Sequence, residues 1–409
     1  MQGKGTFSGH LAVIASIAAL TSCTSPYWQP KVHFAPGDPK EILGVKQLLE
    51  NPRYKEVDVI SIHGMCTHDG KWARGEINDL AKQLGKASED DIKPLKVINS
   101  NAVVYKRTLD FGEKKVNISA LVWSPIMTPL KRGLCYDQKI KTGLCAQGKD
   151  ERPDFLTADI DSPKFDEDRA TINRLGKDTL MDDCLADAMA YQGKAREGIS
   201  RQVQEAILYA AIPSNKTLTP EQLRTAAVGR KDFPLIIITS SLGSKIGFDA
   251  IDALNHKDKP NVDAAKTTVV RTANIFMAAN QWPILQLADQ TIEGGAGEAS
   301  FVSTPTDSLS KLLHDYENEI REFQAGVFRN MLVEQEKKQP TVIVLSDPND
   351  ILSYSWRNSP QRPDYKTVDV VVSNQKTWFN LLENPATAHR GYLTQPYVSN
   401  IIMNGYSEK

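Results

Sequence analysis

The 409-residue sequence has almost no net charge, because 49 Lys and Arg residues oppose 50 Asp and Glu residues and leave a formal charge of -1. It therefore lacks the basic excess with which proteins bind nucleic-acid phosphates, and we expect no nucleic-acid partner. Cys-x-x-Cys pairs, which mark many zinc sites, are also missing. We therefore expect no metal and no cofactor.

A membrane-spanning segment is missing too, since no apolar stretch approaches the roughly 20 residues that a bilayer requires. The run Leu11–Leu20 (LAVIASIAAL), preceded by Lys4, instead suits the central region of an export signal. It ends in Leu20-Thr21-Ser22-Cys23, which resembles the lipobox of bacterial lipoproteins. The resemblance implies that residues 1–22 are a signal peptide and that Cys23 becomes lipidated. The alternative is a buried amphipathic helix with an incidental Cys.

The residue after Cys23 is Thr24 rather than Asp. By the same resemblance, this favours the outer membrane. We therefore expect a lipid-anchored protein of the cell envelope that faces the periplasm or the cell surface.

Four further cysteines permit disulfides in an exported chain, with three connectivities: Cys66, Cys135, Cys145 and Cys184. Cys135 and Cys145 flank a short, mostly polar segment, so we favour that pair. Free thiols are the alternative.

Residues 23–56 begin with several prolines and are expected to form a tether. Over residues 57–409, short β-rich runs alternate with helical segments, and several runs are continuously apolar, as in strands covered on both faces. The expected strands are Val57–Ile62, Asn117–Trp123, Pro234–Thr239, Ala273–Ala278, Thr341–Leu345 and Val368–Val372. The expected helices are Gly75–Leu84, Ala195–Ala211, Ser244–Leu254 and Ser308–Glu336.

This alternation predicts an α/β fold with a mostly parallel sheet flanked by helices. The stretch of about 125–193 is too long for an ordinary connection. We interpret it as an insertion after an early strand, which either covers the site or is an exposed elaboration without a role in catalysis.

The segment from Pro234 to Gly247 (PLIIITSSLGSKIG) joins a β-run directly to a helix. It resembles the nucleophile elbow of the α/β-hydrolase superfamily, in which small residues stand two before and two after the nucleophilic Ser. Ser241 alone fits, with Thr239 and Gly243 at those positions; Thr replaces the family's usual Gly. The alternative is a Ser-rich helix start whose hydroxyls cap backbone N–H groups.

The strand that ends in His63-Gly64-Met65 lies where the superfamily places its oxyanion loop. The resemblance assigns the two oxyanion donors to the backbone N–H groups of Met65 and Leu242. We expect His63 to be a structural hydrogen-bonding residue rather than the base.

The acid and the base follow from the family's order of Ser, then Asp, then His. Asp350 stands a few residues past the run Thr341–Leu345 and directly before a hydrophobic pair, as the family's acid does; Asp347 is the alternative. His389 is the only His after Asp350. The resemblance, which covers about 57–405, therefore implies a catalytic triad of Ser241, Asp350 and His389.

Such a triad implies a serine hydrolase, an esterase or lipase that acts on an acyl-ester or lipid substrate. A lipid anchor would hold it at the membrane. An acyltransferase or thioesterase with the same triad is an alternative, and so is a non-catalytic envelope module that uses the fold for binding.

Overall fold

The computed structural model describes the chain in several stretches: residues 28–36, 38, 40–135, 143–146, 170–256, 259–289, 291–293, 300–302, 307–325, 340–357, 366–377 and 381–408. The expected signal peptide and Cys23 lie outside these residues. Within the described part of the chain, no helix is long and apolar enough to cross a membrane.

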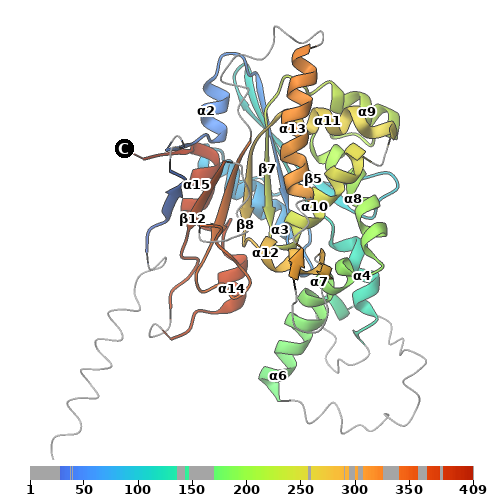
Figure 1. Ribbon diagram of the computed structural model, residues 1–409, viewed down its shortest axis with the longest axis vertical. Helices are drawn as coiled ribbons and strands as arrows, with labels where there is room; N and C mark the ends of the chain where they lie inside the picture. The colour runs from blue at the N-terminus through green and yellow to red at the C-terminus, as the bar shows by residue number, and fades with distance from the viewer. Residues whose placement is uncertain are drawn as a thin grey trace, which may run out of the picture.

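The described residues form one large sheet of nine strands, in the order β1-β12-β11-β8-β7-β3-β6-β5-β4 (Figure 1). Neighbouring strands from β12 to β6 are parallel, whereas β1 at one edge and β5 and β4 at the other are antiparallel. The strand bounds are β1 Lys31–Phe34, β3 Glu56–Ile62, β4 Pro94–Lys96, β5 Val103–Phe111, β6 Lys114–Val122, β7 Leu235–Ser240, β8 Thr272–Ala278, β11 Thr341–Ser346 and β12 Thr367–Val371.

Helices cover both faces of this sheet, and alternate residues of one strand reach opposite layers. Ile60 and Ile62 of β3 pack in one apolar cluster, whereas Val57 and Val59 pack in the other. The first cluster contains residues of α8 (Arg196–Ala210), α9 (Pro220–Val228), α10 (Leu242–His256), α11 (Val262–Val270) and α13 (Ser308–Ala325). The second contains residues of α2 (Val45–Glu50), α3 (Gly70–Gln83) and α15 (Pro396–Asn404).

The expected fold class, an α/β protein with a mostly parallel sheet flanked by helices, is confirmed. All six expected strands are present and shift by only a few residues. Helix α3 begins earlier than expected because the Asp69 side chain accepts hydrogen bonds from the N–H groups of Lys71 and Trp72 and caps the helix.

The segment 23–56, expected to be a tether, contains a strand of the central sheet. Residues Lys31–Phe34 form β1 and pair along β12, so that the backbone N–H and C=O groups of that edge are satisfied. The short strand β2 (Glu41–Ile42) pairs with β13 (Tyr406–Ser407), which ties this segment to the end of the described chain.

The remaining elements follow the carboxyl ends of the parallel strands. After β6 come α4 (Ser124–Arg132), η2 (Gly143–Cys145), α6 (Thr171–Leu175), the π-helix η4 (Gly176–Leu185) and α7 (Ala186–Gln192). After β8 come α12 (Trp282–Leu285), η6 (Gln286–Asp289) and the hairpin of β9 (Thr291–Glu293) and β10 (Ser300–Val302). After β12 comes α14 (Pro385–Arg390), and η5 (Lys259–Asn261) precedes α11.

One acidic side chain is buried between the sheet and α3. Ser61 of β3 donates a hydrogen bond of 2.9 Å to Glu76, and burial raises the pKa of this carboxyl group to about 7. The folded state therefore holds a proton that the unfolded chain, with an ordinary pKa of 4.5, has released. This contribution to stability is lost as the pH rises from 4.5 towards 7.

We therefore expect Glu76→Gln to stabilise the protein at high pH, because Gln keeps an oxygen for Ser61 and carries no charge. The gain in the free energy of unfolding should approach roughly 3 kcal/mol at about pH 8 and vanish near about pH 4. Denaturant unfolding at the two pH values measures it. An equal gain at both would contradict the assignment.

Candidate active site

Ser241 alone joins β7 to α10, since the strand ends at Ser240 and the helix begins at Leu242. Its φ of 53° lies in the left-handed region, which costs a non-Gly residue on the order of 1–2 kcal/mol. The N–H of Ser241 donates to the carbonyl of Ala278 in β8 at 2.8 Å and holds this turn against the neighbouring strand. The side chain is thus fixed at the carboxyl end of β7.

Backbone segments approach Ser241 so closely that two glycines have no room for a side chain. A Cβ at Gly243 would lie 2.2 Å from the carbonyl oxygen of His63. A Cβ at Gly64 would lie 2.7 Å from the Cβ of Ser241. The small-residue rule that singled out Ser241 therefore has a direct steric cause here.

Thr239 replaces the usual Gly of the elbow without disturbing this packing. Its side chain is fully buried, and its hydroxyl lies 2.8 Å from that of Ser244, one turn into α10. The extra atoms are thus accommodated by a hydrogen bond between the strand and the helix.

His389 reaches Ser241 from α14. Its Nε2 lies 3.1 Å from the Ser241 hydroxyl, and its Nδ1 lies 3.0 Å from each carboxylate oxygen of Asp350. The side chain of Asn384 caps the helix by accepting hydrogen bonds from Ala386 and Thr387 N–H groups. The structure therefore brings the three expected residues into one hydrogen-bonded chain.

Asp350 is buried in the loop after β11 and has partners besides His389. One oxygen accepts from the N–H of Leu352 at 3.0 Å, and the other accepts from the Tyr392 hydroxyl at 3.0 Å. Tyr392 in turn accepts a hydrogen bond of 2.7 Å from the N–H of Asp347. These donors fix the position of the carboxylate beside His389.

Asp347, the alternative acid, holds the loop itself. Its two oxygens accept from the N–H groups of Asn349 at 2.9 Å and Asn374 at 2.6 Å. Burial raises the pKa of this carboxyl group. Among the described contacts, Asp350 meets His389 and Asp347 does not.

His63 follows the central strand β3, and its ring nitrogens contact backbone groups rather than the Ser241 hydroxyl. Its Nε2 accepts hydrogen bonds from the N–H groups of Trp123 and Ser124, and its Nδ1 lies 2.7 Å from the carbonyl of Gly64. Burial, together with the neighbouring His68, lowers the pKa of His63 well below its ordinary value. The ring is therefore neutral, and its Nδ1–H donates to Gly64.

The expected oxyanion donors lie on the two segments that meet at Ser241. Leu242 opens α10, and Met65 follows the glycine that packs against the Ser241 Cβ. No described residue accepts a hydrogen bond from either N–H group. The expected role as oxyanion donors would require both N–H groups to be unoccupied in this way.

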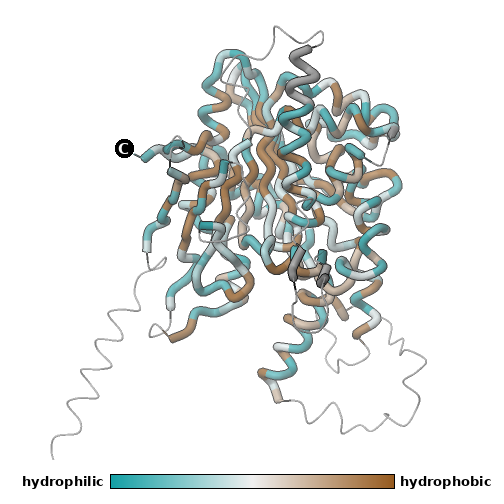
Figure 2. The backbone as a smooth tube through the Cα atoms, in the orientation of Figure 1, coloured by the Kyte–Doolittle hydropathy of each residue, from teal (hydrophilic) through white to brown (hydrophobic). Residues whose placement is uncertain are grey.

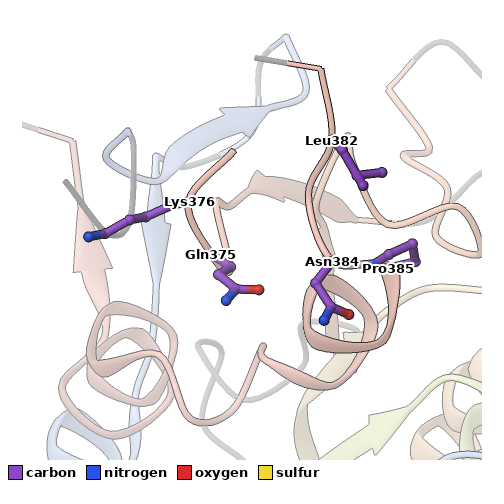
Figure 3. A pocket seen from close by; sticks show the side chains of 5 residues that line it. All are labelled: Gln375, Lys376, Leu382, Asn384 and Pro385. Carbon is purple, nitrogen blue, oxygen red and sulfur yellow. The ribbon is translucent and has the colours of Figure 1, made fainter. Parts of the chain in front are cut away.

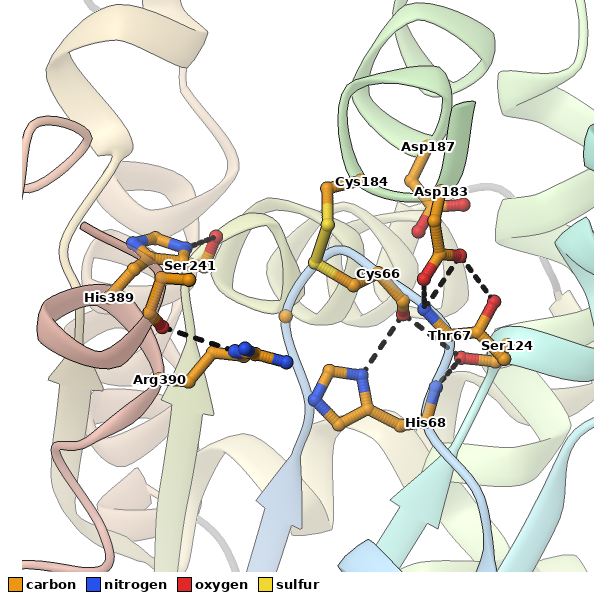
Figure 4. The surroundings of a disulfide bond; sticks show 12 residues. Cys66, Thr67, His68, Ser124, Asp183, Cys184, Asp187, Ser241, His389 and Arg390 are labelled. Carbon is orange, nitrogen blue, oxygen red and sulfur yellow. Dashed lines mark hydrogen bonds between the residues drawn. A yellow bond between two sulfur atoms is a disulfide. The ribbon is translucent and has the colours of Figure 1, made fainter. Parts of the chain in front are cut away.

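The segment that follows β3, which carries Met65, Cys66 and Thr67, is bonded to the insertion (Figure 4). A disulfide joins Cys66, one residue after Met65, to Cys184 in η4. Asp183 accepts hydrogen bonds from the N–H and the hydroxyl of Thr67, and the buried Lys131 of α4 pairs with Asp183 at 2.8 Å and Asp187 at 3.0 Å. The insertion therefore bears directly on the loop that carries Met65.

The pKa values of Asp183 and Asp187, the two carboxyl groups that pair with Lys131, are shifted in opposite directions. For Asp183 burial works against ionisation, but Lys131 and Thr67 outweigh it and lower the pKa. For Asp187 burial dominates and raises the pKa to about 6.

The expected pair Cys135–Cys145 is also bonded. Sequence analysis did not foresee the pairing of Cys66 with Cys184, the buried Lys131 or the Tyr392 contact. A separation of 118 residues leaves no spacing signal for the first, although it is the pairing that remains for these four cysteines once Cys135 bonds to Cys145. The other two depend on tertiary packing.

A separate hollow of about 410 Å³ lies beside the N-terminus of α14 and is lined by Gln375, Lys376, Leu382, Asn384 and Pro385 (Figure 3). None of the three triad residues lines it. In the described part of the chain, no group of three or more His, Cys, Asp or Glu side chains could hold a metal ion.

No protein-family model, curated protein or solved structure matches this chain. The chemistry of the site therefore has to follow from its own geometry. A Ser hydroxyl beside a His that is held by a buried carboxylate is activated as a nucleophile.

The two acids can be told apart by the reactivity of Ser241. Asp350→Asn should slow covalent labelling by a fluorophosphonate at least roughly 100-fold, because the amide no longer holds the His389 tautomer that accepts the Ser proton. Asp347→Asn is the matched control and should slow labelling less than roughly tenfold, although it weakens the loop. Equal rates in the two variants would require reassigning the acid.

Proposed function

We propose that this protein is a serine hydrolase of the α/β-hydrolase type that cleaves carboxylic esters through an acyl-enzyme on Ser241. The observation that carries the proposal is the hydrogen-bonded chain from Ser241 through His389 to Asp350, which starts at a one-residue elbow with positive φ. The order Ser, Asp, His along the chain and the mostly parallel sheet support the same fold type.

In the first half of the reaction, His389 Nε2 takes the proton of Ser241 as Oγ attacks the ester carbonyl carbon. The carbonyl oxygen becomes an anion that the N–H groups of Met65 and Leu242 stabilise. The C–O bond to the alcohol then breaks, and the alcohol leaves with the proton from His389. Asp350 stabilises the imidazolium while His389 carries the proton.

In the second half, water replaces the alcohol. His389 takes a proton from this water, whose oxygen attacks the acyl-enzyme carbonyl. Collapse returns the proton to Ser241 and releases the carboxylic acid. The free enzyme is thereby regenerated.

We further propose that the chain is exported and lipid-anchored through Cys23 in the cell envelope. The sequence Leu20-Thr21-Ser22-Cys23 after an apolar run supports this. Two disulfides support it as well, since such bonds persist mainly in oxidising compartments.

Ser241→Ala should abolish fluorophosphonate labelling and lower kcat for a nitrophenyl ester by at least roughly 10³-fold. Ser240→Ala is the matched control one residue away and should retain both, because Ser240 still belongs to β7. Labelling that persists in folded Ser241→Ala and disappears in Ser240→Ala would shift the elbow by one residue. Adding an alcohol acceptor to the assay separates hydrolysis from acyl transfer by product.

Cells fed labelled palmitate should incorporate it into the wild-type chain and not into Cys23→Ser. The thiol of Cys23 is the attachment point in the proposed modification, and Ser cannot replace it. Gel fluorography of the immunoprecipitated protein measures the incorporation. Equal incorporation of palmitate into the wild type and Cys23→Ser would contradict lipidation at Cys23.

A further inference from the structure

The N-terminal strand fixes the side of the domain from which the upstream chain departs. Because β1 is antiparallel to β12, Lys31 lies beside Val371, the last residue of β12. Val371 lies at the carboxyl ends of the parallel strands, where Ser241 follows β7 and Asp350 follows β11 (Figure 1). We call this end of the sheet its carboxyl or catalytic edge and the other end its amino edge. Everything before Lys31 therefore joins the domain at its catalytic edge.

The connection from Lys31 to the expected anchor is short. Residues 24–30 separate Cys23 from Lys31, and eight steps of extended chain span at most roughly 29 Å. A lipid on Cys23 thus keeps the catalytic edge close to the bilayer, whatever path these residues take.

Large apolar side chains are exposed at this same edge. We call six of them the apolar rim; they lie on α6, α7 and the segments after β11 and β12: Ile172, Leu175, Met189, Ile351, Leu381 and Leu382. Ile172 and Leu381 are each 82% exposed and Met189 is 73% exposed. Such clusters of apolar surface mark contact sites.

The rim lies on both sides of the triad. Helices α6 and α7 lie below the sheet on the side of α4, whereas α14 lies on the side of β12 (Figures 1 and 2). Leu381 and Leu382 precede α14 in the chain. Among the described residues near the amino ends of the parallel strands, two apolar side chains are less exposed than the rim. Leu43, beside the start of β8, is 43% exposed, and Val228, before β7, is 39% exposed.

We propose that the apolar rim docks on the bilayer that holds the Cys23 lipid, and that Ser241 draws its acyl substrate from the lipids of that bilayer. The docking follows from the direction of β1, the short connection and the rim. The choice of substrate rests on the proposed hydrolase activity.

Docking can be measured independently of catalysis by placing a fluorophore at either edge. The full-length lipid-modified chain is reconstituted in vesicles of phosphatidylethanolamine and phosphatidylglycerol, with or without bromine on the acyl chains. Leu381→Trp and Met189→Trp test the two sides of the rim, and Leu43→Trp and Val228→Trp are the matched controls. The emission added by each new Trp, relative to the wild type, is compared between the two kinds of vesicle.

Bromine should quench the added emission at least twofold at Leu381 and Met189 and leave it unchanged at Leu43 and Val228, because quenching requires contact with acyl chains. Equal quenching at both edges, or none at the rim, would overturn the docking. The docking would also be overturned if the rim is not quenched and the protein sediments as a dimer, because a second copy of the chain would then cover the rim.

The substrate class is tested on the pair Leu381→Ser/Leu382→Ser, with Leu43→Ser/Val228→Ser as control. The rim pair should lower kcat/KM for a vesicle-embedded acyl ester at least tenfold and leave a soluble short-chain ester within twofold. An equal loss on both esters, or no loss on either, would overturn the bilayer substrate. If the rim is quenched but the wild type hydrolyses neither ester, the docking is supported and the proposed hydrolase activity is contradicted. If the wild type hydrolyses an ester but the rim is not quenched, the hydrolase activity is supported and the docking is contradicted.

Discussion

Strand β7 and helix α10 are joined by a single residue, and the candidate active site is arranged around that connection. In this short turn Ser241 has a positive φ, and the segment His63-Gly64 lies in contact with the start of the helix. The glycines at 64 and 243 follow from this contact, because a side chain at either would meet backbone or the Ser241 Cβ. The strain at Ser241 is maintained by the fully buried strands on either side of it.

The other two members of the triad are held by contacts that do not involve Ser241. Tyr392 accepts from the backbone of Asp347 and donates to Asp350, so that one hydroxyl links the loop after β11 to the segment after α14. Asn374 donates to the carbonyl of Ala388 and adds a link between the end of β12 and α14. The imidazole and the carboxylate are therefore positioned by a shell of hydrogen bonds before any ligand binds.

The sequence was most informative where burial leaves a simple pattern. Strands covered on both faces are continuous apolar runs, so that β3, β7 and β11 could be located to within one residue or two. The junction of strand and helix at Ser241 has a local signal, because it depends on residues adjacent in sequence, from Thr239 to Gly243.

The antiparallel edges were missed for a physical reason. Strands β1, β4 and β5 mix exposed and buried positions, and their pairing is decided by neighbours far away in the chain. The same holds for the bond between Cys66 and Cys184 and for the burial of Lys131. These are tertiary events without a local signature.

Buried polar groups are paired differently at the amino ends and at the carboxyl ends of the parallel strands. At the amino edge, Asp58 is enclosed by Arg230 and Arg271, so that opposite charges neutralise one another between the starts of the strands. Removing either sign there would leave an uncompensated buried charge. At the carboxyl edge, the N–H groups of Met65 and Leu242 have no acceptor among the described residues, and the Ser241 hydroxyl faces a His. Such unmatched donors would stabilise a negative charge brought beside them, as the proposed ester hydrolysis requires.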